Sequence, residues 1–400
     1  MTSAHTSPAR TETTQILVVG AGPVGLLAGL CAARRGLDVT LLEQNFRGYA
    51  RGYATLLHPS SLRLLSELGL STQLLAEGRP IDSVRVYIDG DSVAHLKLPL
   101  PALTISQSAF EEILLKALRT EGAEFRAPCE ATLLTQSPSG VQVRAVRREL
   151  VSAGSPSQVS EWQPVESSVF EADFVIGADG YDSRVRAALG IETADAGATE
   201  TFAMFEGPQA KAESTFDLAF TSGLGSMLLP LSNRRARWGF QLASDLSLTP
   251  DIGRLHTLLK ERAPWQRDLP EEVAWSTVTD FERRLARSFG RGRVWLAGDA
   301  AHITSPFGGQ SMNSGLTEAH DLVEQMARCI SGKSPLEALT QQGAMREREW
   351  HKLLGFNVQL DILPNAPTWL AEHARRIVPA LPASGQDLRE LLRQLRLAIR

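Results

Sequence analysis

The sequence predicts an α/β protein with a parallel-sheet domain formed by three separate segments of the chain. The segments between them form an antiparallel-sheet domain. A strand, a helix and a second strand follow one another over residues 16–42, which is the pattern of a parallel βαβ unit. The pattern changes to strict alternation around an Asp-Gly turn in residues 82–100, and residues 201–279 are again strand-rich, as expected of antiparallel strands. Buried strands that end in glycine return at residues 174–176 and 294–297.

These changes of pattern divide the 400 residues into interleaved domains. The predicted boundaries are 14–80, 106–195 and 285–345 for the parallel-sheet domain, 81–105 and 196–284 for a substrate-binding β-sheet domain, and 346–400 for a helical C-terminal segment. Residues 1–13 are polar and are predicted to form a disordered tail. A further loop is predicted at residues 152–160, whose composition is rich in Gly, Ser and Pro.

The composition is typical of a globular protein in water. The chain is 43% hydrophobic and 22% charged, with a formal net charge of -4, which argues against a general nucleic-acid binder. No stretch approaches the roughly 18 apolar residues of a membrane span, and residues 1–13 lack the apolar region of a secretory signal. Cys31, Cys129 and Cys329 are too widely spaced for a metal site. We therefore expect a cytoplasmic monomer or homodimer without a metal, nucleic-acid partner or integral membrane contact.

A glycine motif follows the first strand. Gly20-Ala21-Gly22-Pro23-Val24-Gly25 leads into a helix over residues 23–35, and Glu43 ends the second strand. The first glycine permits a tight turn, the second lets a diphosphate approach the backbone, and the third lets the helix pack close to the strand. A carboxylate at the position of Glu43 is suited to bind a ribose 2′-OH and disfavours a 2′-phosphate. The motif predicts a Rossmann-type site for FAD or NAD.

Two later motifs add to the first, and only the earlier of them is ambiguous when taken alone. Gly177-Ala178-Asp179-Gly180 could be an ordinary turn before a helix, capped by Asp182 or Ser183. In the third motif, Gly298-Asp299 ends a buried strand and the segment 306–313 leads into a helix through Gly308 and Gly309. Backbone N–H groups at such a helix start can bind an electron-rich ring edge. His302 is interpreted as a structural hydrogen-bonding residue, with a proton relay as the alternative.

The three motifs, in this order, resemble the FAD-dependent aromatic hydroxylases of the p-hydroxybenzoate hydroxylase type, the group A flavoprotein monooxygenases, which include tetracycline-inactivating monooxygenases. The resemblance spans residues 16–330. It implies one FAD, NAD(P)H as reductant and no second nucleotide domain. It also implies hydroxylation of a small aromatic or polyketide-like substrate by O2 through a flavin C4a-hydroperoxide, as in secondary metabolism. The alternatives are a halogenase, a prenyl-chain reductase or a non-catalytic flavin-binding protein; Trp238-Gly239-Phe240 does not match the halogenase signature.

The resemblance also assigns residues to the site. The cofactor-binding residues that it implies are Gly20, Gly22, Pro23, Val24, Gly25, Glu43, Arg51, Gln107, Asp179, Gly180, Gly298, Asp299, Gly309, Gln310, Ser311, Met312 and Asn313. Arg47 is a competing match for Arg51, and the family usually has glycine at the position of Ser311. The candidate catalytic positions beside the flavin ring are Pro306, Gly308 and Gly309.

The substrate side is predicted from apolar residues of the antiparallel sheet. The candidates for an apolar pocket that covers the flavin are Phe205, Phe216, Met227, Trp238, Phe240 and Phe307. Plain core is the alternative, because alternation places only every second residue on one face. Leucines at 388, 391, 392 and 395 predict an amphipathic helix that docks on the body or, less favoured, on a membrane surface. Ser108 and Glu111 predict a capping box.

Overall fold

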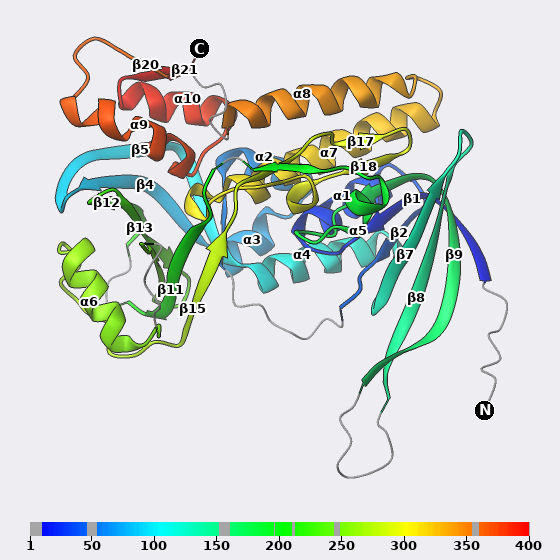
Figure 1. The fold of residues 1–400 in the computed structure, drawn as a ribbon, viewed down its shortest axis with the longest axis horizontal. Coiled ribbons are helices and arrows are strands. Elements are labelled where there is room, and N and C mark those ends of the chain that lie inside the picture. The colour runs from blue at the N-terminus through cyan, green and yellow to red at the C-terminus, as the bar shows by residue number, and fades with distance from the viewer. Residues whose placement is uncertain are drawn as a thin grey trace.

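The computed structural model describes residues 10–45, 54–151, 161–195, 197–209, 213–243, 249–353 and 360–399. Two large sheets lie beside each other, and helices of the C-terminal segment lie along one side of both (Figure 1). The α/β class, the interleaved antiparallel sheet and the helical C-terminus agree with the sequence prediction. None of the described helices is both long and apolar enough to cross a membrane.

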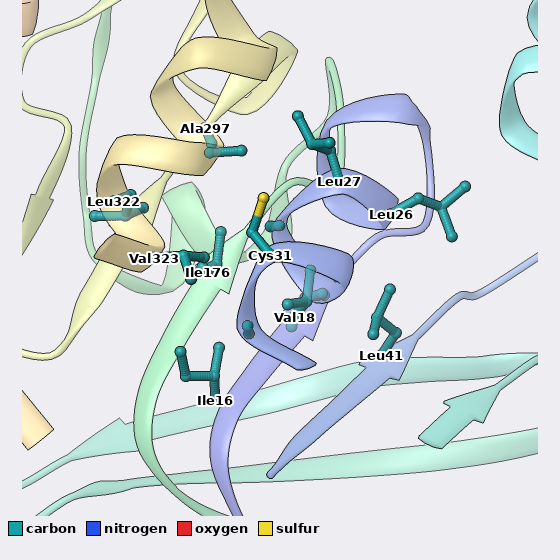
Figure 2. Close-up of a cluster of buried hydrophobic side chains, with 14 of the residues drawn as sticks. Ile16, Val18, Leu26, Leu27, Cys31, Leu41, Ile176, Ala297, Leu322 and Val323 are labelled. Carbon is teal, nitrogen blue, oxygen red and sulfur yellow. The ribbon is translucent and has the colours of Figure 1, made fainter. Parts of the chain in front are cut away.

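The first sheet contains a parallel core in the order β18-β9-β1-β2-β6. Its strands are β1 (Arg10–Val19), β2 (Val39–Leu42), β6 (Glu124–Arg126), β9 (Glu161–Gly177) and β18 (Val294–Leu296). Helices α1 (Pro23–Arg34) and α7 (Gln310–Ile330) pack side by side on this core. Figure 2 shows Ile16 and Val18 of β1 beneath Cys31 of α1, and Val323 of α7 beside Ile176 of β9, all in one buried cluster. This half also contains α4 (Gln107–Thr120), β7 (Cys129–Gln136), β8 (Val141–Val151), α5 (Arg184–Ala188) and β17 (Gly290–Arg291), which pairs with β18.

Two predictions in this half were wrong at element ends. The disordered tail predicted over residues 1–13 was wrong for residues 10–13, because β1 begins at Arg10 and residues 10–14 pair with residues 168–172 of β9; residues 1–9 lie outside the described residues. The cap of α4 is Ser106, whose Oγ accepts a hydrogen bond from the Ala109 N–H at 3.2 Å, and not Ser108. The loop predicted at residues 152–160 lies outside the described residues.

The second sheet has the order β15-β11-β14-β13-β12-β4-β5-β3. Its strands are β3 (Ala54–Leu57), β4 (Arg79–Ile88), β5 (Asp91–Ser106), β11 (Glu200–Pro208), β12 (Thr215–Thr221), β13 (Leu224–Leu231), β14 (Arg235–Gln241) and β15 (Trp275–Phe281). The predicted turn joins β4 to β5, and both Asp89 and Gly90 have positive φ angles, of 48° and 92°, as a two-residue hairpin turn requires.

Different helices cover the two faces of this second sheet. Helix α6 (Ile252–Arg262), which the sequence analysis did not predict, packs on one face. Helices α9 (Thr368–Ala380) and α10 (Gly385–Gln394) pack on the other. The leucines of α10 are buried against β4 and β5, so the prediction that this amphipathic helix docks on the body is confirmed. Helices α2 (Pro59–Glu67), α3 (Ser71–Glu77) and α8 (Glu337–Leu353) complete the helical layer.

Removing one leucine of α10 tests how much this docking stabilises the fold. Leu391 is fully buried, so Leu391→Ala is expected to lower the free energy of unfolding by about 2–5 kcal/mol through lost burial and the cavity that remains. The measurement is chemical denaturation monitored by circular dichroism. Leu100→Ala is the control, because Leu100 is 47% exposed; equal effects of the two substitutions would contradict tight docking of α10.

Candidate active site

The glycine turn after β1 is built by close backbone contacts. Gly20 has a φ of +97°, and a Cβ on this residue would lie 2.3 Å from the Ala178 carbonyl oxygen. A Cβ on Gly25 would lie 2.0 Å from the Gly20 carbonyl oxygen. Both positions therefore exclude any side chain. By contrast, apart from its neighbours along the chain, no atom of the described residues lies within 4 Å of the place where a Cβ on Gly22 would be, and this open space suits the approach of a diphosphate.

The N-terminus of α1 adjoins the same open space, and no side chain of α1 caps its first N–H groups. Its N-cap Gly22 offers no side-chain hydrogen bond, and the first turn carries no acidic residue, so the first N–H groups are left for an anion. Glu43 lies beside the turn: Oε2 accepts from the Ala21 N–H and Oε1 accepts from the Asn45 N–H, each at 2.8 Å. Each carboxylate oxygen keeps a second lone pair for a ligand hydroxyl.

The Asp179-Gly180 motif is adjacent to this turn, because Ala178 pairs with Val19 and presses on Gly20. Asp179 Oδ1 accepts from the Ser183 hydroxyl at 2.6 Å, and Oδ2 accepts from the Val185 N–H at 3.1 Å. Burial raises the pKa of Asp179. Ser183 caps α5 by accepting from the Arg186 N–H at 2.9 Å, as one of the two cap predictions had it. The Asp179 carboxylate thus shapes the turn that follows β9.

The third motif packs onto the start of α1. A Cβ on Gly298 would lie 3.0 Å from Val24 Cγ2, so the three motifs meet at the carboxyl ends of adjacent strands β1, β9 and β18. Asp299 follows β18 and is exposed to solvent, although the protein around it raises the pKa of its carboxyl. Its Oδ1 accepts from the Ser311 hydroxyl at 3.0 Å. Oδ2 has no hydrogen-bond partner among the described residues and remains available to a ligand hydroxyl.

His302 lies behind Asp299 in the core. Its Nε2 is 2.6 Å from Glu318 Oε2, and Trp350 Nε1 donates to Glu318 Oε1 at 2.6 Å. The imidazole stacks on the Trp350 ring with 3.7 Å between ring centroids. Burial acts to raise the pKa of Glu318, but the charge of His302 and the hydrogen bonds from His302 and Trp350 bring it below the usual value. These contacts support the structural interpretation of His302 over the proton relay.

The glycine-rich turn at residues 307–309 is held by the C-terminal part of the chain. Gly308 has a φ of +70°, and a Cβ there would lie 2.7 Å from the Pro379 carbonyl oxygen. Gln310 Nε2 donates to the carbonyl oxygens of Leu381 at 2.8 Å and Ala383 at 3.1 Å. Asn313 Nδ2 donates to the Leu56 carbonyl oxygen at 2.7 Å.

Several side chains that were predicted to bind the cofactor instead make contacts within the protein. Gln310 and Asn313 are almost completely buried and hydrogen-bonded to backbone groups, and Met312 packs on the core of the first sheet. Gln107 is the first residue of α4, and its Nε2 donates to Glu111 Oε1 at 2.8 Å. Arg51 and its alternative Arg47 lie outside the described residues.

The sequence analysis missed His58, the residue that precedes α2. The imidazole is fully buried, and its Nε2 forms a short hydrogen bond with the Gly308 carbonyl oxygen. Its backbone N–H donates to Asn313 Oδ1 at 2.7 Å. Burial lowers the pKa of His58 to about 4, so the ring is neutral at pH 7. A histidine before Pro59 carries no distinguishing pattern, because its partners come from residues that are distant in the sequence.

The predicted substrate residues fall on opposite faces of the second sheet. Phe216, Met227 and Phe307 belong to the cluster that α9 and α10 cover, and the Phe307 ring lies 5.1 Å from that of Phe202. The prediction was wrong for Phe205, Trp238 and Phe240, which are core residues between the sheet and α6. Strand alternation explains the error, because neighbouring residues of one strand point to opposite faces.

A buried ion pair lies on the same face as Phe307 and was also missed. Glu206 comes two residues after Met204 in β11, which places both on one face. Arg237 of β14 donates from Nε to Glu206 Oε1 at 2.8 Å, and its guanidinium lies 5.4 Å from the centre of the Trp275 ring. The signal that the sequence offered was a charged residue within an apolar run of each strand: Glu206 after Phe205, and Arg237 between Ala236 and Trp238.

The sequence is similar to a family of FAD-binding domains and to several monooxygenases. A family model described as FAD binding domain matches residues 13–356. The chain is 28% identical over 359 residues to 6-methylpretetramide 4-monooxygenase of Streptomyces rimosus, covering 85% of the chain and 60% of that protein. It is 26% identical to pentachlorophenol 4-monooxygenase of Sphingobium chlorophenolicum, covering 83% and 62%. The chain thus spans little more than 60% of the length of these relatives.

Solved structures share the fold over nearly the whole chain. The p-nitrophenol 4-monooxygenase PnpA from Pseudomonas putida DLL-E4 superposes with a TM-score of 0.71 at 19% identity, covering 96% of this chain and 97% of that one. PqsL from Pseudomonas aeruginosa, described as a probable FAD-dependent monooxygenase, has a TM-score of 0.73 at 18% identity, covering 91% and 97%. At identities of 18–19%, the similarity to these structures shows a shared fold.

The buried neutral His58 makes stability depend on pH. Its pKa is about 4 in the folded chain and near 6.5 when unfolded, so the unfolded state binds more protons between these values. Stability is therefore fully present above pH 6.5 and falls as the pH drops towards 4, by on the order of 3 kcal/mol. Urea unfolding of the wild type and of His58→Gln at several pH values is the measurement. Parallel pH profiles for the two proteins would show that His58 does not titrate in this way.

Proposed function

The chain belongs to the FAD binding domain family, as its resemblance to the FAD-dependent aromatic hydroxylases predicted, and we propose that it is an FAD-dependent monooxygenase. In this proposal it uses NAD(P)H and O2 to hydroxylate a small aromatic or polyketide-like molecule. The observation that carries the proposal is the meeting of three distant motifs at the ends of β1, β9 and β18, around the open space at Gly22. Its relatives include monooxygenases named for pretetramide and chlorophenol substrates.

The residues present fit FAD along its length. The open backbone at Gly22 and the free N–H groups of α1 suit the diphosphate. Glu43, beside the glycine turn, would accept from the adenosine ribose, and Asp299 Oδ2, which has no hydrogen-bond partner among the described residues, would accept from the ribityl hydroxyls. Gly308 packs against the Pro379 carbonyl oxygen, and in this proposal the flat ring would lie along the partly exposed Pro306 and Gly309 of the same turn. When bound, FAD supplies the hydride acceptance and oxygen activation that the side chains lack.

The second sheet provides the substrate side of this proposal. Phe216, Met227 and Phe307 are buried in the cluster beneath α9 and α10, and in this proposal they would form the apolar, water-excluding side of the substrate site. The buried Glu206–Arg237 pair adds hydrogen-bonding groups to the same face. Arg235 also contacts Glu206, with 3.4 Å between Nη2 and Oε2. An apolar face that carries these charged groups suits a substrate that combines fused or substituted rings with hydroxyl, keto or carboxylate groups.

Replacing Glu43 tests the cofactor half of the proposal. Glu43→Ala is expected to weaken FAD binding by about 1–3 kcal/mol, because the ribose hydroxyls lose a charged acceptor. The measurement is titration of the apoprotein by flavin fluorescence quenching. Glu121→Ala is the control, since Glu121 pairs with Arg34 on the surface and is expected to leave affinity unchanged. A protein that stays colourless when supplied with FAD would refute the assignment altogether.

The origin of the transferred oxygen tests the reaction. The protein, loaded with FAD, is incubated with NAD(P)H, isotopically heavy O2 and a panel of phenols and polyketide-like compounds, and product masses are measured. We expect the true substrate to stimulate NAD(P)H oxidation and to gain one heavy oxygen atom. Product that forms without O2, or with oxygen from water, would favour a reductase instead. Stimulated oxidation that yields only hydrogen peroxide identifies a mimic of the substrate.

A further inference from the structure

The carbonyl of Gly308 is buried against residues from two distant parts of the chain. Gly308 itself is buried, and its carbonyl oxygen accepts from Nε2 of His58. On the other side, the turn presses on Pro379 and on the segment 381–384, the C-terminal connector between α9 and α10. The glycine-rich turn is therefore enclosed by α2 and by the C-terminal connector.

The hydrogen bonds fix the tautomer and the orientation of the His58 ring. Because a carbonyl oxygen only accepts, the proton is on Nε2 and Nδ1 is the acceptor. Ser384 Oγ of the C-terminal connector lies 3.5 Å from Nδ1 and 2.8 Å from Ser60 Oγ. A continuous chain of donors thus runs from α2 through Ser384 and His58 to Gly308. Arg63 and Asp387, whose Nη2 and Oδ2 atoms are 2.7 Å apart, hold α2 and α10 together beside it.

This chain of bonds acts on an unusual stretch of backbone. Gly308 and Gly309 both adopt left-handed conformations, with φ of +70° and +64°. A glycine pair has many accessible conformations, so the turn needs external contacts to keep one of them. Since the peptide group is planar, fixing the Gly308 carbonyl also fixes the peptide plane that joins Gly308 to Gly309. His58 therefore determines which surface the turn presents to its neighbours.

We propose that His58 is a positioning residue for the flavin: through Gly308 it holds the turn in the conformation that covers the cofactor ring. The C-terminal connector takes part through Ser384, which orients the imidazole, and through Gln310, whose amide binds two connector carbonyls. This inference rests on the proposed function, because it requires FAD in the site. It adds a role for a residue that does not touch the cofactor.

Two substitutions separate the hydrogen bond from the space that the ring fills. His58→Gln keeps an N–H donor near the position of Nε2, whereas His58→Leu fills the site without a donor. Hydrogen exchange of residues 306–313 is measured first, with and without FAD. Exchange in His58→Leu is expected to be roughly five- to tenfold faster than in the wild type, and close to wild type in His58→Gln. His95→Leu is the control, because His95 is exposed on β5.

The second readout is the visible circular dichroism of FAD bound to each variant at saturation. We expect an altered spectrum for His58→Leu and a wild-type spectrum for His58→Gln. Ser384→Ala is expected to change the exchange rate and the flavin spectrum in the same direction as His58→Leu. It replaces His58→Leu in the test if that variant does not fold. Unchanged exchange in His58→Leu and Ser384→Ala, or faster exchange with an unchanged flavin spectrum, would overturn the proposal. Both readouts need no substrate, so a protein that passes them but forms no oxygenated product would refute only the proposed function.

Discussion

The site depends on one set of backbone contacts, where β1 and β9 end and α1 begins. The Gly20 carbonyl lies where Gly25 would carry a side chain, and the Ala178 carbonyl lies where Gly20 would carry one. Two strands and a helix can meet this closely only without Cβ atoms. The contact places the N–H groups of α1, the carboxylate of Glu43 and the turn after β9 around one open space. The glycines that allow this close packing also leave the backbone exposed at Gly22, and an exposed backbone is what a diphosphate needs for close approach.

The second sheet imposes a different constraint, because both of its faces are covered. Helix α6 closes one face with an apolar interface, so the large aromatic residues there contribute to stability. The other face meets Phe307 and the C-terminal helices. The burial of Glu206 and Arg237 on this face is costly unless the two charges stay paired.

Local patterns in the sequence predicted the elements whose signals are local. The bounds of β2 and the start of α1 follow from a short apolar run and a glycine motif, and the Asp89-Gly90 turn follows from its residue types. The family resemblance assigned Gly20, Asp179 and Asp299 to one cofactor site, and the structure brings the strands that precede them together in the order β18-β9-β1. Helix α6 was missed because it lies within a strand-rich region. The face of each aromatic residue and the role of His58 depend on partners far along the chain, which no local pattern contains.

The C-terminal connector has a consequence for the order in which the molecule can be completed during synthesis. The diphosphate end of the site draws on β1, α1, β2 and the turn after β9, all of which leave the ribosome early. The turn at residues 307–309 is made much later, and the residues 381–384 that enclose it later still. Because domains fold as their chain emerges, a nascent chain can form the glycine turn after β1 well before the turn at residues 307–309 meets the C-terminal connector. The enclosure of the turn at residues 307–309 is therefore completed last, after the strands of both sheets have been made.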